Sequence, residues 1–281
     1  LAEVGERDRI LEVGPGIGTL TIALLKHAAS VVAVERDPDL PAVLADTLYP
    51  WRERFTLIEK DALNLTAADI GEPLPNKFVS NLPYAVAATV VLDYFQQFPF
   101  LESATVMVQK EVADRMAAER GTKNYGAYTV KLGLYAEVAG RFAVGPGNFF
   151  PPPRVDSAVI RLNRRVPRMA DGAPAAPEVI AAACLMADAA FANRRKTLAN
   201  SCKTYFAGRG GIALTPIGDL AEATDSVTLD GPAVASRLPA LFEAAAIDSR
   251  RRGETLDQGE FLALGAALLA LTGASAGAAA E

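Results

Sequence analysis

Short apolar segments alternate with helix-like segments over roughly the first 160 residues, and this alternation constrains the fold more than any other feature. Seven segments have the length and apolar content of strands: Arg9–Val13, Val31–Val34, Phe55–Glu59, Lys77–Ser80, Ala104–Gln109, Glu137–Val144 and Asp156–Leu162. Helix-like segments lie between them at Leu20–Ala28, Pro41–Leu48, Ala85–Phe95 and Lys110–Glu119. Such alternation is typical of a parallel sheet that helices cover on both faces. We therefore predict an α/β, Rossmann-like fold with a mostly parallel sheet of seven strands.

The pattern changes after about Arg168, where proline and alanine become frequent and helical periodicity replaces the strand pattern. Helices are predicted at Pro177–Asn193, Pro232–Ala246 and Asp257–Leu271, and a loop is predicted at the glycine-rich segment Gly208–Gly211. We therefore expect two domains, an α/β domain over residues 1–167 and a smaller helical domain over residues 168–281.

Composition excludes several classes of protein. Apolar residues make up 51% and charged residues 22% of the 281 residues, which is typical of a globular chain. With two cysteines and a single histidine, His27, neither a zinc site nor a histidine-dependent hydrolase is expected, and His27 is interpreted as a surface or helix-end residue. Neither a run of eighteen apolar residues nor a basic, apolar leader occurs, so we expect a cytoplasmic protein.

The charge is distributed unevenly. The net charge is -5, yet residues 154–203 carry nine basic and four acidic side chains. A basic segment in an acidic protein is typical of a contact with a polyanion, although a solvated helix face would show the same composition.

The first chemical motif joins the first strand to its helix. Gly14, Gly16 and Gly18 stand at alternate positions, and Thr19 is a plausible N-cap of the helix. Glycines allow a tight turn and a close approach of a ligand to the backbone. The spacing G-x-G-x-G differs from the G-x-G-x-x-G of dinucleotide-binding folds, which disfavours a nicotinamide dehydrogenase.

Acidic residues stand at three positions beside this motif. Glu35 ends the second strand and can accept both hydroxyl groups of a ribose, and Asp61 follows the third strand and can accept the amine of adenine. Glu12 precedes the glycines and could face an ammonium or sulfonium group. Each acid alone could be a helix cap or a solvated loop residue, but together and in this order they favour S-adenosylmethionine as cofactor.

The second motif, Asn81-Leu82-Pro83-Tyr84, directly follows the fourth strand. The exocyclic nitrogen of a base is a poor nucleophile because its lone pair is delocalised into the ring. The Asn81 side-chain oxygen and the Leu82 carbonyl can accept its two N–H groups and so localise that lone pair. Pro83 stiffens the loop and Tyr84 can stack on a purine. A simple turn with a packed tyrosine is the alternative.

In their order and spacing these motifs resemble those of the ribosomal RNA adenine N6,N6-dimethyltransferases. Five later segments are similar to signatures of that family: Val108–Arg115, Lys123–Gly126, Phe150–Val159, Asn193–Leu198 and Arg252–Leu256. The resemblance extends over about residues 9–270 and points to the enzyme that acts on the small ribosomal subunit.

The resemblance implies a role for each matching residue. The fold would be that of an S-adenosylmethionine-dependent methyltransferase. The enzyme would act as a monomer on two adjacent adenosines in a terminal hairpin loop of 16S rRNA. The cofactor would be bound by Gly14, Gly16, Gly18, Glu35, Asp61, Ala62 and Asn81. The target base would be held by Asn81, Leu82, Pro83 and Tyr84 and enclosed by Phe150. RNA phosphates would be bound by Arg154, Arg194, Arg195 and Lys196.

One family feature is not found, a Q-N-F-L segment that precedes the glycine loop and covers the cofactor. Gly14 has only 13 residues before it, so we expect weaker cofactor binding than in a chain that carries this segment. Two other functions remain open at this point. One is methylation of 23S rRNA, as in the related antibiotic-resistance enzymes, although the helical-domain signatures favour the small subunit. The other is a non-catalytic ribosome-assembly factor or transcription-factor relative, which the intact Asn81 and Tyr84 disfavour.

Overall fold

The computed structural model describes residues 1–214 and 227–273. The chain divides into two compact units, which are described separately. The first comprises Leu1–Asp114 and Ala136–Arg164, and the second comprises Arg115–Tyr135 and Arg165–Glu281, part of which lies outside the described residues. The division near residue 165 is close to the boundary expected after residue 167. The segment 115–135, expected in the first domain, belongs instead to the second unit, because its helix packs against helices of that unit.

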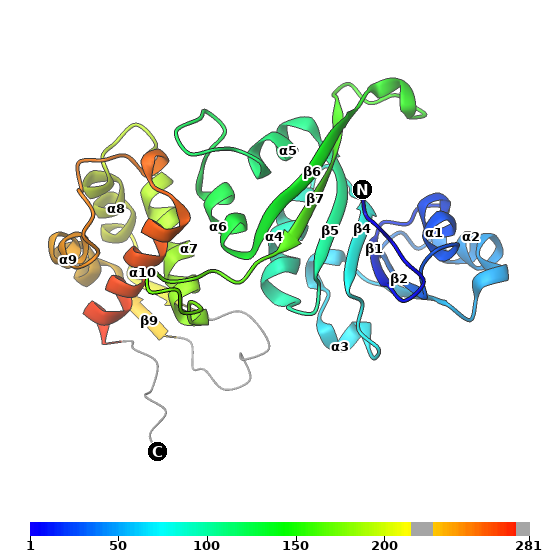
Figure 1. Cartoon of the computed structure of the whole chain (residues 1–281), viewed down its shortest axis with the longest axis horizontal. Helices are drawn as coiled ribbons and strands as arrows, with labels where there is room; N and C mark the ends of the chain where they lie inside the picture. The colour runs from blue at the N-terminus through cyan, green and yellow to red at the C-terminus, as the bar shows by residue number, and fades with distance from the viewer. Residues whose placement is uncertain (215–226, 274–281) are drawn as a thin grey trace, which may run out of the picture. The chain divides into compact units, whose positions relative to one another are not determined.

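A seven-stranded sheet forms the first unit, in the order β3-β2-β1-β4-β5-β7-β6 (Figure 1). The strands are β1 (Arg9–Val13), β2 (Ser30–Glu35), β3 (Phe55–Glu59), β4 (Lys77–Asn81), β5 (Ser103–Gln109), β6 (Ala136–Val144) and β7 (Ser157–Arg164). The strands β1 to β5 pair in parallel, whereas β7 pairs antiparallel with both β5 and β6. The predicted mostly parallel Rossmann-like sheet is confirmed. Its carboxyl edge at β1 and β4 is the place where ligands bind in such sheets.

The helices of the first unit are α1 (Thr19–Leu25), α2 (Leu40–Thr47), α3 (Ala67–Ile70), α4 (Ala87–Gln97) and α5 (Lys110–Met116), the last of which runs two residues into the second unit. Four of these helices lie at the predicted segments, whereas the short helix α3 was not predicted. Ile10, Leu25, Val31 and Leu44 are buried together where α1 and α2 pack beside the sheet. This burial fixes β1 and α1, and therefore fixes the glycine loop between them.

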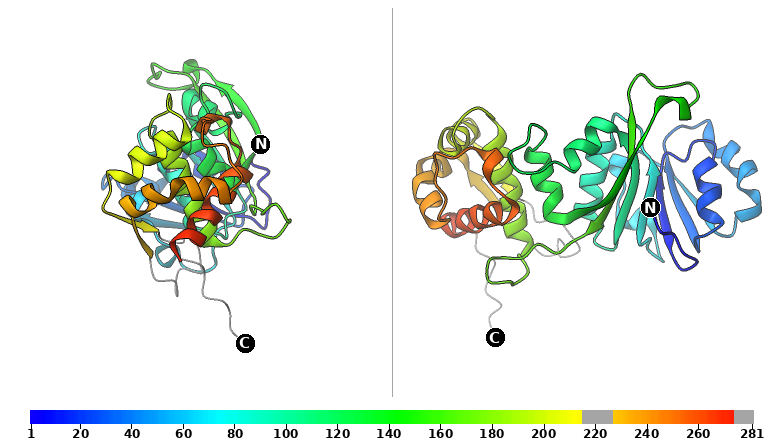
Figure 2. Two further views of the ribbon diagram at one scale, coloured as in Figure 1. Left: turned by 90° about the vertical axis from the view of Figure 1, so that its left-hand side faces the viewer. Right: turned by 45° about the horizontal axis from the view of Figure 1, so that its top comes forward.

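The second unit is mainly helical. Helices make up most of it in both views of Figure 2. Its elements are α6 (Ala127–Tyr135), α7 (Pro177–Phe191), α8 (Leu198–Ala207), α9 (Gly231–Ala244) and α10 (Gln258–Thr272), with the antiparallel pair β8 (Gly211–Leu214) and β9 (Val227–Asp230). The three predicted helices are confirmed. The predicted loop at Gly208–Gly211 is wrong at its last residue, because Gly211 pairs with Asp230 and begins β8. Gly265 allows α10 to lie close to α7, since a Cβ there would come within 2.6 Å of the Ala183 nitrogen.

Candidate active site

The glycine loop adopts a backbone conformation that only glycine accepts readily. Gly14, Gly16 and Gly18 have φ angles of +68°, +56° and +89°. A Cβ on Gly14 would lie 3.6 Å from the ring of Pro83, so the loop after β1 lies against the loop after β4. The prediction that Thr19 caps α1 is wrong, because Gly18 is the N-cap and Thr19 is the first helical residue. The left-handed Gly18 turns the chain directly into the helix.

Two cavities lie at this loop, and Gly14 and Gly16 line both of them. The smaller cavity has a volume of about 360 Å³, and its lining includes Glu35, Asp61, Ala62 and Pro83. The larger has a volume of about 740 Å³, and its lining includes Glu12, Asn81 and Thr105. Their sizes are those of small-molecule sites. Six of the seven residues predicted to bind the cofactor line these two cavities: Gly14, Gly16, Glu35, Asp61, Ala62 and Asn81. The seventh, Gly18, lines neither of them.

The two acids of the smaller cavity are held by nearby backbone groups. Glu35 is 9% exposed, and its Oε1 accepts hydrogen bonds from the backbone nitrogens of Arg36 and Asp37 at 2.8 and 2.9 Å. Asp61 accepts a hydrogen bond from the Leu63 nitrogen and pairs with the Arg36 guanidinium at 3.3 Å. Asp61 therefore does cap a short 3-10 helix, the alternative that the sequence left open, while it also lines the cavity.

Glu12 is a buried carboxyl group in the larger cavity. It is 1% exposed, and Thr21 Oγ1 donates a hydrogen bond to its Oε2 at 2.7 Å. Burial raises the pKa of Glu12 to about 7, although the Thr21 hydrogen bond opposes this rise. Among the described residues that line the cavity, no other side chain is ionisable. The sequence did not identify Thr21 as the partner of Glu12. The two residues are only nine positions apart, on β1 and α1, so a strand, turn and helix of this length allow the contact.

The loop after β4 leaves the sheet at Asn81. Before it, the buried Ser80 donates a hydrogen bond to the Val13 carbonyl at 2.6 Å and so ties β4 to β1. After it, the Leu82 nitrogen donates to the Met107 carbonyl at 3.1 Å, and the Leu82 side chain is buried. Asn81 itself is exposed and lines the larger cavity. The loop is thus anchored on both sides of the residue whose amide was predicted to contact the base.

Tyr84 lies half-buried at the end of this loop. Its hydroxyl is 2.6 Å from Ser157 Oγ, at the start of β7. Ser157 belongs to the segment that carries the family resemblance, but no feature of the sequence identifies its contact with Tyr84. Phe150 and Arg154, from the segment before β7, are both exposed. Phe150 is fully exposed and lines neither cavity, so its predicted role at the base stays a prediction.

Arg194, Arg195 and Lys196 lie in the turn between α7 and α8, not on a helix face. Arg194 pairs with Glu254 at 3.2 Å and donates a hydrogen bond to the Thr122 carbonyl. The side chains of Arg195 and Lys196 are exposed and form no ion pair or hydrogen bond with the described residues. Arg194 therefore joins neighbouring loops of the second unit, while Arg195 and Lys196 remain available to a partner.

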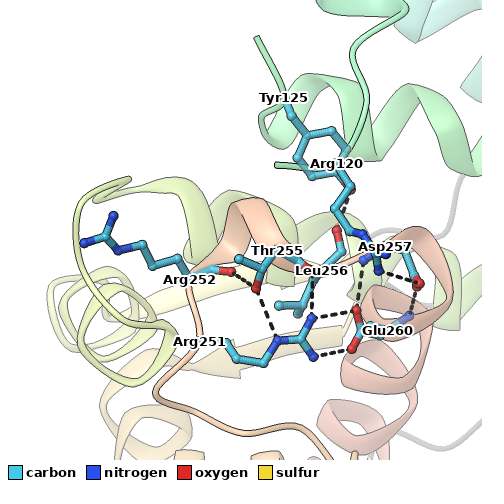
Figure 3. A network of polar contacts seen from close by, with 8 residues as sticks. All are labelled: Arg120, Tyr125, Arg251, Arg252, Thr255, Leu256, Asp257 and Glu260. Atoms are coloured by element: carbon cyan, nitrogen blue, oxygen red, sulfur yellow. Dashed lines mark hydrogen bonds and ion pairs between the residues drawn. The ribbon is translucent and has the colours of Figure 1, made fainter. Parts of the chain in front are cut away.

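A polar network stabilises the adjoining loop and the start of α10 (Figure 3). Arg251 forms a two-pronged ion pair with Glu260, and Asp257 caps α10 by accepting a hydrogen bond from the Glu260 nitrogen at 2.9 Å. Tyr125 donates to the Leu256 carbonyl at 2.7 Å, and Arg120 pairs with Asp257 at 3.4 Å. The signature Arg252–Leu256 is thus part of a folded loop with many internal contacts.

The basic segment 154–203 is not one uniform surface. Arg161 pairs with Glu3 at 2.6 Å, and Arg164 donates to the carbonyls of Phe95, Phe98 and Leu101. These two arginines stabilise the first unit, and the segment crosses into the second at residue 165. The excess positive charge therefore has partly a structural explanation.

The fold and the cleft define a Rossmann-like, S-adenosylmethionine-dependent methyltransferase, with a glycine loop after β1 and acids at the ends of β2 and β3. The family model described as ribosomal RNA adenine dimethylase matches residues 1–225. The chain belongs to this family, and it is an enzyme that uses S-adenosylmethionine to dimethylate adenine in ribosomal RNA.

A ribosomal RNA small subunit methyltransferase A from Streptomyces griseus is 42% identical over 94% of this chain and 80% of that protein. Among solved structures, a dimethyladenosine transferase from Plasmodium falciparum has a TM-score of 0.67 at 22% identity, covering 94% of this chain and 90% of that one. The 23S rRNA methyltransferase ErmE has a TM-score of 0.60 at 23% identity, covering 95% and 93%. These two structures share the fold of this chain.

Over residues 1–214 and 227–273, no helix combines the length and apolar character that a membrane span requires. Within the same residues, no group of histidine, cysteine and acidic side chains has an arrangement that could hold a metal ion.

Proposed function

We propose that this enzyme transfers methyl groups from S-adenosylmethionine to the N6 amines of two adjacent adenosines in the 3′-terminal hairpin loop of 16S rRNA, during maturation of the small ribosomal subunit. One observation carries the proposal. Asn81, at the end of β4, lines the same cavity as Glu12, Gly14 and Gly16, which supports a shared site for the target base and the cofactor. The 42% identity to a small subunit methyltransferase, against 23% to ErmE, favours 16S over 23S rRNA.

The residues of the two cavities fit S-adenosylmethionine. The left-handed glycines leave the backbone uncovered, Glu35 Oε2 can accept from ribose hydroxyls, and Asp61 and Ala62 would face the adenine. The buried Glu12 carboxyl offers the negative charge that a cationic sulfonium or ammonium group requires. When bound, the cofactor supplies a methyl group that is already activated for transfer.

The chain's own residues would orient the target amine. Asn81 Oδ1 and the Leu82 carbonyl would accept the two N–H groups of the adenine amine and so localise its lone pair. The hydrogen bond from the Leu82 nitrogen to the Met107 carbonyl anchors the Asn81–Leu82 peptide. Pro83 restricts the backbone of Leu82, whose carbonyl would accept from the amine. Tyr84 would stack on the purine. Each of these residues would act by positioning the base. Because the sulfonium is already a good leaving group, orientation of the amine is the main contribution required of the protein.

Cationic side chains on both units would meet the phosphates of the RNA. Arg154 in the first unit and Arg195 and Lys196 in the second have exposed side chains suited to this role, whereas Arg194 would contribute while it also holds Glu254. We expect the enzyme to act as a monomer in the cytoplasm, where ribosomal subunits are assembled.

Transfer of tritiated methyl groups to unmodified ribosomal subunits tests this function. We expect label in 16S rRNA of small subunits, mapped by mass spectrometry to two adjacent adenosines near the 3′ end, each carrying two methyl groups. Asn81→Ala should abolish labelling while the variant still binds the small subunit. Label in 23S rRNA, or equal labelling by Asn81→Ala, would contradict the proposal.

A further inference from the structure

The aromatic ring that ends the base-binding loop is fixed at its far end. Tyr84 leaves the loop after β4, and its hydroxyl lies 2.6 Å from Ser157 Oγ, a residue 73 positions further along the chain. Either hydroxyl can be the donor, so the pair is satisfied in both orientations. A tyrosine held at its Cα and at its hydroxyl loses much of the freedom that its two side-chain torsions would otherwise give the ring.

Ser157 is a rigid anchor. It is completely buried, and it is the first residue of β7, which pairs with a strand on each side. Its register partners are Gln109 on β5 and Val144 on β6. A hydroxyl carried on a strand between two neighbours moves less than one carried on a loop.

We propose that Ser157 is a positioning residue for methyl transfer, because it holds the Tyr84 ring in the plane on which the target adenine stacks. This inference rests on the proposed function of Tyr84. The ring is tied to β7 through Ser157, whereas the contacts of Leu82 and Ser80 tie the backbone around Asn81 to β5 and β1. A stacked base inherits the orientation of the ring beneath it, and a small angular error in a reacting group is costly.

Ser157 directly follows the segment that contains Phe150 and Arg154. The hydrogen bond therefore connects the Tyr84 ring to the end of a segment that we expect to contact RNA. An RNA contact that displaced this end of the segment would also displace the ring, through Ser157.

A double-mutant cycle in the full chain tests the catalytic consequence. We expect Ser157→Ala and Tyr84→Phe each to lower kcat on small subunits about tenfold, which corresponds to about 1.4 kcal/mol, with unchanged KM for S-adenosylmethionine. The double variant should fall no further than either single variant, because both substitutions remove the same hydrogen bond. Ser103→Ala serves as the matched control. Ser103 is a buried serine and the first residue of β5, at the amino ends of the parallel strands, whereas Ser157 faces Gln109 at the carboxyl end of β5. A kcat for Ser157→Ala within twofold of that of the unmodified chain, or independent effects that multiply, would overturn the inference.

A measurement of ring order separates this inference from the proposed function and from a folding defect. In protein labelled with ¹³C-tyrosine, the Tyr84 signals are identified by their loss in Tyr84→Phe. Ser157→Ala should make the Tyr84 ring more mobile while the other tyrosine signals and the melting curve stay close to those of Ser103→Ala. Unchanged Tyr84 signals would refute the anchoring role. If the unmodified chain transferred no methyl groups to small subunits, but the Tyr84 ring became mobile only in Ser157→Ala, the anchoring role would stand and the proposed function alone would be refuted.

Discussion

Replacement of Glu12 by glutamine should stabilise the first unit at alkaline pH. Burial raises the pKa of Glu12 from 4.5 to about 7, so the folded chain binds this proton more tightly than the unfolded chain does. Below pH 4.5 the carboxyl is protonated in both states and costs nothing. As the pH rises from 4.5 to 7 the folded state progressively loses stability, and above pH 7 the loss is complete. The difference of about 2.5 pKa units corresponds to about 3 kcal/mol.

Glutamine has the shape of glutamate, carries no charge and can still accept the hydrogen bond of Thr21. We therefore expect Glu12→Gln to raise the free energy of unfolding by up to about 3 kcal/mol at pH 8 and by much less at pH 5.5. Urea unfolding followed by the fluorescence of Trp51 is the assay. This single tryptophan lies in the first unit and packs against its core, so it reports that unit and not the helical one.

The exposed Glu6 provides the control, since Glu6→Gln should not change stability appreciably at either pH. A gain for Glu12→Gln of the same size at pH 5.5 and pH 8 would show that charge is not the cause. Equal stability of Glu12→Gln and the unmodified chain at pH 8 would refute the reasoning that burial penalises this carboxylate.

Three further predictions concern ligands. The affinity for S-adenosylmethionine, measured by calorimetry, should rise as the pH rises through about 7, because the deprotonated Glu12 attracts the cationic cofactor. If Glu12→Gln showed the same pH profile, Glu12 would not be the cause of the pH dependence. Gly14→Ala should weaken cofactor binding and cost about 1–2 kcal/mol of stability, because φ is +68° there and an L side chain is strained in this conformation. Wild-type values in calorimetry and urea unfolding would contradict this. The double substitution of Arg195 and Lys196 by alanine should weaken filter-measured binding to small subunits and make it less dependent on salt, whereas an unchanged salt slope would exclude phosphate contacts at these residues.

The sheet could be predicted from the sequence because the strands β1, β2, β4, β5 and β7 are largely buried and therefore apolar. Phe55–Glu59 and Arg9–Val13 have the predicted bounds, and the other strands differ from the prediction by at most two residues at either end. The assignment of residues 115–135 to the second unit could not be predicted, because it depends on the packing of α6 against α7, which lies some fifty residues later. The same holds for β8, whose partner β9 follows a gap in the described residues.

The site was predictable where each functional residue lies at or just after the end of a parallel strand. Gly14, Gly16, Glu35, Asp61 and Asn81 line the cavities because parallel strands bring their carboxyl ends to one edge. The contact of Tyr84 with Ser157 was not predictable, since it depends on the antiparallel placement of β7 beside β5. The left-handed φ of Gly18, which displaced the predicted cap at Thr19, was likewise not readable from residue type alone.

A crystal structure of this chain with bound S-adenosylmethionine would show where the cofactor lies relative to Asn81. We expect ribose hydroxyls on the Glu35 carboxylate and the methyl group directed at the space beside the Asn81 amide. A cofactor bound elsewhere, or a methyl group directed away from Asn81, would contradict it.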